Sequence, residues 1–422
     1  MANKLLAKMK KEKAFGELLR TEQKPVEWLS TNCIAVNLLL SGKIMGGIKK
    51  GSISMIAAGS GWGKSMIGYA VLKAAQDSGM DCFIVDTENS VNYDLLTKLG
   101  IDMNEVGVFG PTNRIPKIKQ FLSKLSAGLT LDEARNTFLL FDSWGPIIEE
   151  QVMEKAEEAS SAVNMSSAKF KNEVANILLS CGFTTLVMNH VYASLDMYGD
   201  PYKIPGGMRI IFNADAIMLG SSAKKEKDKE KNILGKIITA GVAKGRAAKE
   251  FVKTHYLILH AGGISPYYGL LEEAMESGVV YKPKPGYYAR INYDTPVDPE
   301  TGELGTPAKI WKEEELYCAK FWIPLYKDPT FRKFVETKFA FEDQVLINAN
   351  EDVMKLIAAE DAGEITYSEN TGIDLELGAE AVAAEEEINA ALSKGKRKKV
   401  KSPMEIMAED FETSEDSNDF ES

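Results

Sequence analysis

A glycine-rich octapeptide, AGSGWGKS from Ala58 to Ser65, holds the residues best suited to chemistry in this chain of 422 residues. It matches the phosphate-binding pattern [AG]-x-x-x-x-G-K-[ST], with a strand-like apolar run before it and an amphipathic, helix-like segment after it. Backbone N–H groups at such a turn can surround phosphate oxygens. The predicted nucleotide-binding residues are Ala58, Gly59, Ser60, Gly61, Trp62, Gly63, Lys64, Ser65 and Met66.

Three residues around this loop have specific expected roles. The Lys64 ammonium group would reach the β and γ phosphates of ATP, and the Ser65 hydroxyl would bind Mg²⁺. Asp142 ends the apolar run TFLLFD and is expected to act on the same Mg²⁺, directly or through water. The alternative is a glycine-rich turn that binds no ligand, and Asp142 makes this alternative less favoured.

An ATPase of this kind also needs a group that orients the attacking water. Asp86 and Glu88 both lie where the run CFIVD ends, at the carboxyl edge of a predicted sheet, where open α/β sheets bind ligands. Spacing alone favours Glu88 without excluding Asp86.

The elements that must position these residues form a regular pattern. From about residue 53 to residue 190, short apolar runs alternate with helix-length amphipathic segments, which predicts a doubly wound, largely parallel α/β sheet. After residue 214, consecutive strand-like runs predict antiparallel strands that extend one edge of this sheet. The lysine-rich stretch KKEKDKEK between two of these runs is expected to be a solvated hairpin loop.

Four ranges are expected along the chain: an N-terminal helical segment (1–30), an ATPase core (31–269), a small C-terminal lobe (270–347) and a charged, largely disordered tail (348–422). The N-terminal helix would either pack on its own core or contact a neighbouring protomer. The net charge of −11 belongs to the tail, because residues 351–422 hold 20 acidic and 7 basic residues, which leaves about +2 for residues 1–350.

The four cysteines are widely spaced and form no C-x-x-C pair, which indicates neither a disulfide framework nor a zinc site. The chain has no signal-peptide pattern at its start and no apolar run long enough to span a bilayer. We therefore expect an intracellular, cytoplasmic protein with no membrane partner.

The order of these parts resembles that of RecA-type recombinases, most closely their bacteriophage branch, from roughly Leu38 to Phe341. The resemblance rests on the phosphate loop and on the segments DTENSVNYDLLTKLGID, LLFDSWGP, LVMNHVY, AGVAKGR and AGGISPYYGLLEEAMESGVVYKPKPGYYAR. The last segment is the most specific, because a general motor core would not require it. The resemblance implies a RecA-like ATPase core that uses ATP and Mg²⁺. It also implies the cytoplasm of the host cell as the location if a phage encodes the chain.

The family likeness also implies roles for single residues. It favours Glu88 over Asp86 as the base that polarises water, and it makes His190 the sensor of the γ-phosphate. Lys244 and Arg246 align with a basic pair that crosses a protomer boundary to the neighbour's ATP, where such cations stabilise the transferring phosphoryl group. Without the resemblance, a solvated pair at a strand end would be the simpler interpretation of these two cations.

One position departs from the family. Relatives commonly place Tyr seven residues after the catalytic Glu to pack on adenine, whereas this chain has Leu95 there and Tyr93 two residues earlier. The residue that packs on adenine is therefore left open.

Two loops of the family hold single-stranded DNA, one after the strand that ends in Asp142 and one after the strand that ends in His190. The second loop combines aromatic and cationic residues with a glycine pair, which suits stacking and phosphate neutralisation without sequence preference. The candidate DNA-binding residues are Lys169 in the first loop and Tyr198, Tyr202, Lys203, Gly206, Gly207 and Arg209 in the second. An ordinary surface loop is the alternative.

The sequence thus predicts an ATP-dependent recombinase that forms a helical filament on single-stranded DNA and exchanges strands with homologous duplex DNA. Mediator and single-strand-binding proteins are expected partners, and the acidic tail would dock them, compete with DNA or only solubilise the chain. One rival is a ring-shaped helicase with a RecA core, expected to carry a separate N-terminal domain, whereas about fifty residues precede the phosphate loop. The other rival is a mediator that binds DNA or partners and does not hydrolyse ATP, and the presence of Lys64, Ser65, Glu88 and Asp142 disfavours it.

Overall fold

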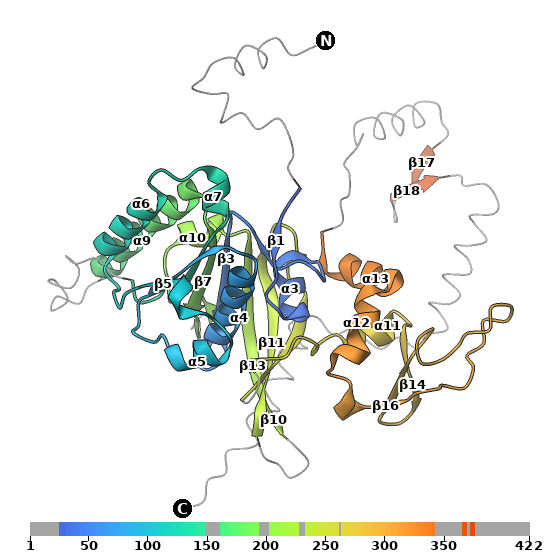
Figure 1. Cartoon of the computed structure of the whole chain (residues 1–422). Helices are drawn as coiled ribbons and strands as arrows, with labels where there is room; N and C mark the ends of the chain where they lie inside the picture. The colour runs from blue at the N-terminus through green and yellow to red at the C-terminus, as the bar shows by residue number, and fades with distance from the viewer. Residues whose placement is uncertain are drawn as a thin grey trace, which may run out of the picture. The chain divides into compact units, whose positions relative to one another are not determined.

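The computed structural model describes residues 25–147, 161–193, 202–227, 233–260, 263–341, 365–368 and 372–375 (Figure 1). The chain divides into two compact units, Met1–Asp343 and Gln344–Ser422. Within the described ranges, no helix is long and apolar enough to cross a membrane.

The first unit is built on one mixed sheet, which has nine strands within the described residues. In the order in which they pair, these are β13 (Gly263–Ile264), β12 (Lys253–Leu259), β11 (Ile233–Gly245), β10 (Ala216–Lys227), β3 (Ile53–Ala58), β7 (Thr184–His190), β6 (Thr137–Asp142), β4 (Asp81–Asp86) and β5 (Val106–Phe109). The strands from β10 to β5 run parallel, and β11, β12 and β13 each pair antiparallel with the strand before them. The predicted parallel sheet with an antiparallel extension is confirmed.

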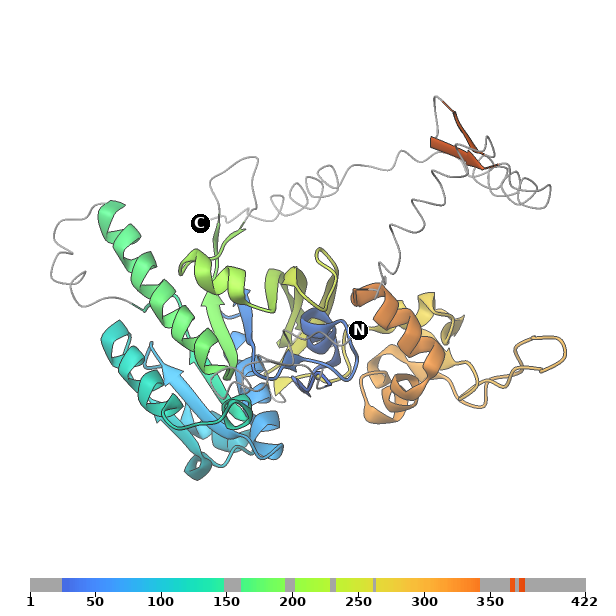
Figure 2. The same ribbon diagram turned by 90° about the horizontal axis from the view of Figure 1, so that it is seen from above.

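Helices cover both faces of this sheet (Figures 1 and 2). On one face lie α3 (Ile34–Ser41), α4 (Lys64–Asp77) and α5 (Tyr93–Lys98), and on the other lie α6 (Ile115–Ser126), α7 (Leu131–Arg135), α9 (Ser161–Cys181) and α10 (Met208–Asn213). An apolar cluster lies on each face of the sheet, one with α3, α4 and α5 and the other with α6, α7, α9 and α10. Successive strand residues point to opposite faces, so Leu140 of β6 belongs to the first cluster and Leu139 to the second. Burial on both faces explains why the parallel strands read as continuous apolar runs.

The C-terminal lobe packs directly on the core of the first unit. Its elements are α11 (Leu271–Glu276), β14 (Val280–Lys284), β15 (Tyr287–Arg290), β16 (Trp311–Lys312), α12 (Ala319–Lys327) and α13 (Pro329–Phe339). The Lys249 amide donates to the Phe339 carbonyl at 2.7 Å, and the Phe341 amide donates to the Ala247 carbonyl at 3.0 Å. Buried side chains of α12 and α13 share one apolar cluster with α3 and α4, so the lobe and the core have a common interior.

The lysine-rich stretch KKEKDKEK is a point where the structure differs from expectation. Strand β10 continues through Lys227 and pairs with β11 as far as Ile233, so the first half of this stretch is strand rather than loop. Backbone pairing continues because Lys224 and Lys225 are exposed, so their charges stay in water. The second half, residues 228–231, lies outside the described residues.

Both ends of the chain are described only in part. Of the segment 1–30 expected to be helical, residues 1–24 lie outside the described residues, and β1 (Trp28–Leu29) pairs with β2 (Ile48–Lys49). Of the tail expected to be largely disordered, only β17 (Ile365–Ser368) and β18 (Gly372–Leu375) are described, and they pair antiparallel. The predictions for the remainder of both segments concern residues outside this description.

Candidate functional site

The loop from Ala58 to Ser65 joins the end of β3 to the start of α4. Gly61 and Gly63 have φ values of 72° and 78°, and a Cβ on Gly63 would lie 1.8 Å from Cδ1 of Ile258, so that position requires glycine. Helix α4 begins at Lys64, which turns its free N–H groups and the positive end of its dipole toward the loop. This arrangement fits a bound phosphate chain.

Two residues of the antiparallel strands donate hydrogen bonds to the backbone of the same loop. Lys236 of β11 donates from Nζ to the Gly61 carbonyl at 3.0 Å, and the Tyr256 hydroxyl of β12 donates to the Trp62 carbonyl at 3.3 Å. Burial raises the pKa of Tyr256, which keeps its hydroxyl protonated and able to donate. The antiparallel strands therefore help to position the loop's backbone.

The ends of neighbouring parallel strands bring the other predicted residues to this loop. Ser65 donates from Oγ to Oδ2 of Asp142 at 2.9 Å. The Lys64 ammonium group lies 3.0 Å from the Ala58 carbonyl and 3.4 Å from Nδ1 of His190. Lys64, Ser65, Asp142 and His190 thus meet at the carboxyl edge of the sheet.

Glu88 joins this group from the turn after β4. Its Oε1 lies 3.1 Å from Nε2 of His190 and accepts a hydrogen bond from the Ser143 hydroxyl. Asp86 turns into its own loop instead, where Oδ1 accepts hydrogen bonds from the amides of Glu88 and Ser90 at 3.1 and 3.2 Å. The two carboxylates that the spacing left as alternatives therefore have different surroundings, and Glu88 is the one that contacts His190.

Burial shapes the electrostatics of this cluster. Desolvation lowers the pKa of Lys64, although the nearby Asp142 and Glu88 carboxylates oppose the shift. Desolvation also raises the pKa of Asp142, which the Ser65 hydrogen bond opposes and the charge of Glu88 reinforces. A buried carboxylate beside a serine hydroxyl is a suitable oxygen pair for Mg²⁺, whose charge would offset the cost of burial. Ser65 and Asp142 therefore fit the predicted metal site.

Lys244 and Arg246 lie at the opposite edge of the sheet from the phosphate loop of their own chain. Lys244 of β11 is paired with Ile217 of β10, and Ile217 is paired in turn with Met55 in the first half of β3. The phosphate loop instead follows the last residue of β3. Lys244 Nζ donates to the Ile211 carbonyl at 2.9 Å. Desolvation and the adjacent Arg246 lower the pKa of Lys244.

Arg246 pairs with Asp215 at 3.2 Å and stays half-exposed. Neither cation of this pair joins the cluster around Lys64 within one chain.

The candidate DNA-binding residues occupy two neighbouring places. Arg209 of α10 donates from Nε to Asn176 of α9 at 2.8 Å, and its amide donates to Asn172 at 3.1 Å. Lys169 lies one turn before Asn172 on the same side of α9 and is exposed. The structure thus brings one residue of each predicted DNA loop to a shared surface.

The base of the second loop is a short hairpin of β8 (Tyr192–Ala193) and β9 (Tyr202–Lys203). The Tyr202 hydroxyl donates to the Ser221 carbonyl at 3.0 Å, which engages its polar end, while Lys203 is exposed. Tyr198 lies outside the described residues.

Gly206 and Gly207 follow the hairpin, and Gly206 contacts Trp144 in the segment after β6. A Cβ on Gly206 would lie 2.3 Å from Cδ1 of Trp144, so the close approach requires glycine. The Trp144 indole donates to the Gly206 carbonyl at 2.7 Å, and the Asn189 amide donates to the Pro205 carbonyl at 2.7 Å. The end of the second loop is therefore held by the segment after β6 and by β7, the strands that end in Asp142 and His190.

Sequence reasoning missed several residues of this site. Four residues touch the predicted residues or their backbone without having been assigned a role. Ser143 and Trp144 lie in the segment LLFDSWGP, whereas Lys236 and Tyr256 lie in none of the segments named above. For Ser143 and Trp144 the available signal was their place directly after Asp142. For Lys236 and Tyr256 the sequence offered none, because their contacts depend on how the antiparallel strands meet the loop.

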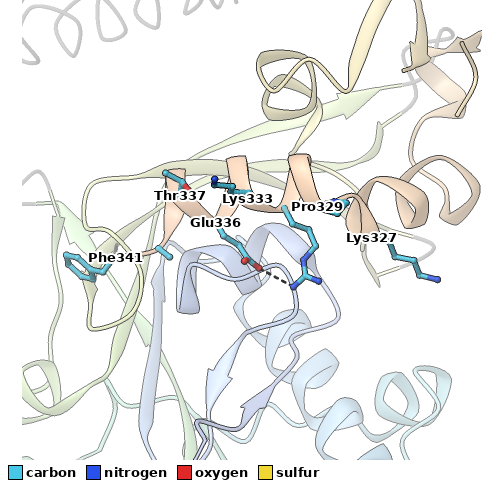
Figure 3. A pocket seen from close by; sticks show the side chains of 8 residues that line it. Lys327, Pro329, Lys333, Glu336, Thr337 and Phe341 are labelled. Carbon is cyan, nitrogen blue, oxygen red and sulfur yellow. Dashed lines mark ion pairs between the residues drawn. The ribbon is translucent and has the colours of Figure 1, made fainter. Parts of the chain in front are cut away.

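A separate pocket of about 470 Å³ lies along α13 in the C-terminal lobe (Figure 3). It is lined by Lys327, Pro329, Arg332, Lys333, Glu336, Thr337, Ala340 and Phe341. Arg332 and Glu336 pair at 3.6 Å within it. None of the predicted site residues lines this pocket, so the candidate chemistry stays at the sheet edge.

Comparison with known proteins gives two family matches. Residues 2–265 match the RecA N-terminal domain, and residues 267–335 match the C-terminal domain of the bacteriophage T4 recombination and repair protein. The recombination and repair protein of Enterobacteria phage T4 is 26% identical over 397 residues, which cover 92% of this chain and 96% of that protein. RecA of Rickettsia massiliae is 24% identical over 287 residues, 66% of this chain and 80% of the relative. RecA of Streptomyces venezuelae is 23% identical over 284 residues, 66% and 72% of the two chains.

Proposed function

Because this chain belongs to the RecA family and is a RecA-type recombination and repair protein, we propose that it assembles as a helical filament on single-stranded DNA and exchanges strands with homologous duplex DNA. As a member of this family it is in general terms a DNA-dependent ATPase. The proposal adds the residues that bind and hydrolyse ATP, the DNA-contacting loops and the filament.

The observation that carries the proposal is the meeting of Lys64, Ser65, Glu88, Asp142 and His190 at the carboxyl edge of the sheet. These residues come from the ends of three strands and the start of one helix. A purely structural role would not require a lysine, a serine, two carboxylates and a histidine to lie together there. A phosphate chain in the loop would meet the N–H groups of α4 and the Lys64 ammonium group.

Each residue has a defined task in hydrolysis. Ser65 and Asp142 would hold Mg²⁺, which neutralises phosphate charge when it is bound. Glu88 accepts a proton from the attacking water, and His190 lies between Glu88 and Lys64, where it can sense whether a γ-phosphate is present. The exposed Tyr93 is the better candidate for adenine packing, because Leu95 packs against the core.

The position of Lys244 and Arg246 supports a head-to-tail assembly. Because these cations lie at the sheet edge opposite their own phosphate loop, they can stabilise phosphoryl charge only at the site of another protomer. A contact between two different surfaces generates an open helix when its rotation does not close. Filament formation and ATP binding would then depend on each other.

DNA contacts are proposed for the surface shared by α9 and α10 and for the hairpin of β8 and β9. Lys169, Lys203 and Arg209 are exposed there and can neutralise phosphates. Gly206 and Gly207 would let the loop follow the DNA strand, with Tyr198 and Tyr202 as the aromatic candidates.

Electron microscopy and a strand-exchange assay on one purified sample test this function. With ATP and single-stranded DNA we expect helical filaments, and with homologous duplex we expect joint molecules that require ATP. Closed rings in the microscope would favour a helicase instead. Filaments without strand exchange would favour a mediator.

We also propose mediator and single-strand-binding proteins as partners, recognised in part by the acidic tail. Deletion of residues 402–422 is expected to change the affinity for DNA and its dependence on salt and Mg²⁺. Unchanged DNA binding in this deletion would leave solubility as the role of these residues.

A further inference from the structure

Thr87 and Ser143 are buried polar residues between the ends of β4 and β6. The paired strands end at Asp86 and Asp142, and the Thr87 amide continues the pairing by donating to the Asp142 carbonyl at 3.0 Å. The Thr87 hydroxyl then donates to the Ser143 carbonyl at 2.6 Å and accepts from the Ser143 amide at 2.8 Å. One side chain thereby satisfies both backbone groups of Ser143, as a neighbouring strand would.

The fixed backbone of Ser143 aims its side chain at Glu88. The Ser143 hydroxyl donates to Oε1 of Glu88, and His190 approaches the same oxygen from Nε2 at 3.1 Å. Because both contacts meet Oε1, the second oxygen, Oε2, is the one that can turn toward a water molecule. A carboxylate held at one oxygen keeps its other oxygen in a defined direction, which proton abstraction from water requires.

We propose that Thr87 and Ser143 are positioning residues for ATP hydrolysis, with Thr87 holding Ser143 and Ser143 orienting the Glu88 carboxylate. This inference rests on the proposed role of Glu88 as the base. Neither hydroxyl is assigned to nucleotide or metal, and both act through Glu88. Their loss should therefore slow the chemical step and leave ATP binding intact.

Thr87→Val removes the hydroxyl while keeping the branched shape, and Thr87→Ser keeps the hydroxyl. For Ser143→Ala we expect kcat to fall about tenfold, the size expected for a lost hydrogen bond to a charged group, with KM for ATP within about twofold of the wild type. We expect a similar fall for Thr87→Val, because Ser143 then loses the side chain that holds its backbone and with it the aim of its hydroxyl at Glu88. Thr87→Ser should retain kcat within about twofold, because its hydroxyl can still meet both backbone groups of Ser143.

Thr184→Val is a matched control. The Thr184 hydroxyl is equally buried and also bridges two backbone groups, donating to Arg135 at 2.7 Å and accepting from Gly51 at 2.8 Å, at the other end of the sheet. Its loss should lower the melting temperature as Thr87→Val does and leave kcat unchanged. Equal losses of kcat in Thr184→Val and Thr87→Val would indicate a general effect of buried hydroxyls and overturn the proposal.

The Glu88→Gln background separates this inference from the proposed function. If the pair acts through Glu88, adding Thr87→Val or Ser143→Ala to Glu88→Gln causes no further loss in single-turnover hydrolysis, whereas independent effects multiply. Multiplied losses, or wild-type kcat in both single variants, would overturn the positioning role while Glu88 remains the base. Normal turnover in Glu88→Gln alone would remove the proposed base itself.

Discussion

Trp144 donates a hydrogen bond from its indole nitrogen to the carbonyl oxygen of Gly206 at 2.7 Å. Trp144 lies two residues after Asp142, and Gly206 lies at the end of the second predicted DNA loop. The contact therefore links the sheet edge that carries the candidate nucleotide-binding residues to the proposed DNA surface. Asn189, next to His190, adds a parallel link to Pro205.

Trp144→Phe should weaken the coupling between ATP and DNA. Phenylalanine keeps an aromatic ring but lacks the N–H donor, so the Gly206 carbonyl loses its partner at a cost of about 1 to 3 kcal/mol. We expect ATP to bind as in the wild type while the ATP-dependent gain in single-strand affinity falls several-fold. Fluorescence anisotropy of a labelled oligonucleotide with ATP and with ADP measures this gain.

Trp311→Phe is the control for this experiment. The Trp311 indole donates to the Asp294 carboxylate at 2.9 Å within the C-terminal lobe, so this variant also loses a buried indole hydrogen bond, at a distant place and to a charged acceptor. It should lower the melting temperature and keep the ATP-dependent gain. A wild-type gain in Trp144→Phe would show that the Gly206 contact carries no coupling.

His190→Ala should reduce the response of DNA affinity to ATP. His190 contacts Lys64 and Glu88 through its two ring nitrogens. Among the described residues it is the one side chain that contacts both, so its truncation removes the link between them. His190→Gln should retain part of the response, because an amide can both donate and accept. Titration with single-stranded DNA in the presence of ATP and of ADP gives the ratio of the two affinities, which measures this response. An unchanged ratio in His190→Ala would exclude it as the sensor.

The sequence predicted the parts of this protein that local patterns determine. The apolar runs matched β3, β6 and β7, because a strand buried on both faces requires continuous apolar residues. The extent of β10 was not predictable, since its charged end is held by backbone pairing with β11.

In the site, too, the residues of local motifs could be predicted and the contacts between distant segments could not. Lys64 and Ser65 belong to a contiguous motif, whereas the contacts of Ser143 and Lys236 join segments 55 and 175 residues apart. Such contacts depend on the register of the strands and leave no local pattern in the sequence.

Asp142→Asn should stabilise the nucleotide-free protein. Burial raises the pKa of Asp142 in the folded state, so the folded state binds more protons than the unfolded state between the two pKa values. The free energy of unfolding therefore falls as pH rises through this range. Above the folded-state pKa the carboxylate is fully ionised, and the folded state then bears the whole cost of burying its charge. Asparagine has no charge to bury, and we expect a gain of about 1 kcal/mol, or roughly 1 to 2 °C in Tm for a unit of this size.

Thermal denaturation between pH 4 and pH 8, without nucleotide, measures this gain. The difference in Tm between Asp142→Asn and the wild type should grow with pH. Added Mg²⁺ and ATP should raise the Tm of the wild type more than that of Asp142→Asn, because the variant lacks a proposed metal ligand. An equal or lower Tm for the variant at pH 8 would contradict the cost assigned to burial of this carboxylate.

Two inactive variants should restore hydrolysis when they are mixed, if Lys244 acts on a neighbour's ATP. Lys64→Ala lacks a competent phosphate loop but keeps Lys244, and Lys244→Ala keeps its loop. In a mixed filament, some interfaces join the intact loop of one protomer to the intact Lys244 of the next. Random head-to-tail order makes such interfaces roughly a quarter of the total, so we expect about that fraction of wild-type activity at equal mixing.

The mixing ratio provides the internal control. Hydrolysis should peak when the two variants are equimolar and vanish when either is alone, because each competent interface needs one protomer of each kind. Lys249→Ala is a control for lost charge on the same hairpin, since Lys249 Nζ donates to the Thr337 carbonyl of its own chain at 2.7 Å. Mixed with Lys64→Ala, it should only dilute activity. If the mixture of Lys64→Ala and Lys244→Ala stays inactive at every ratio while still forming filaments, Lys244 does not act across the interface.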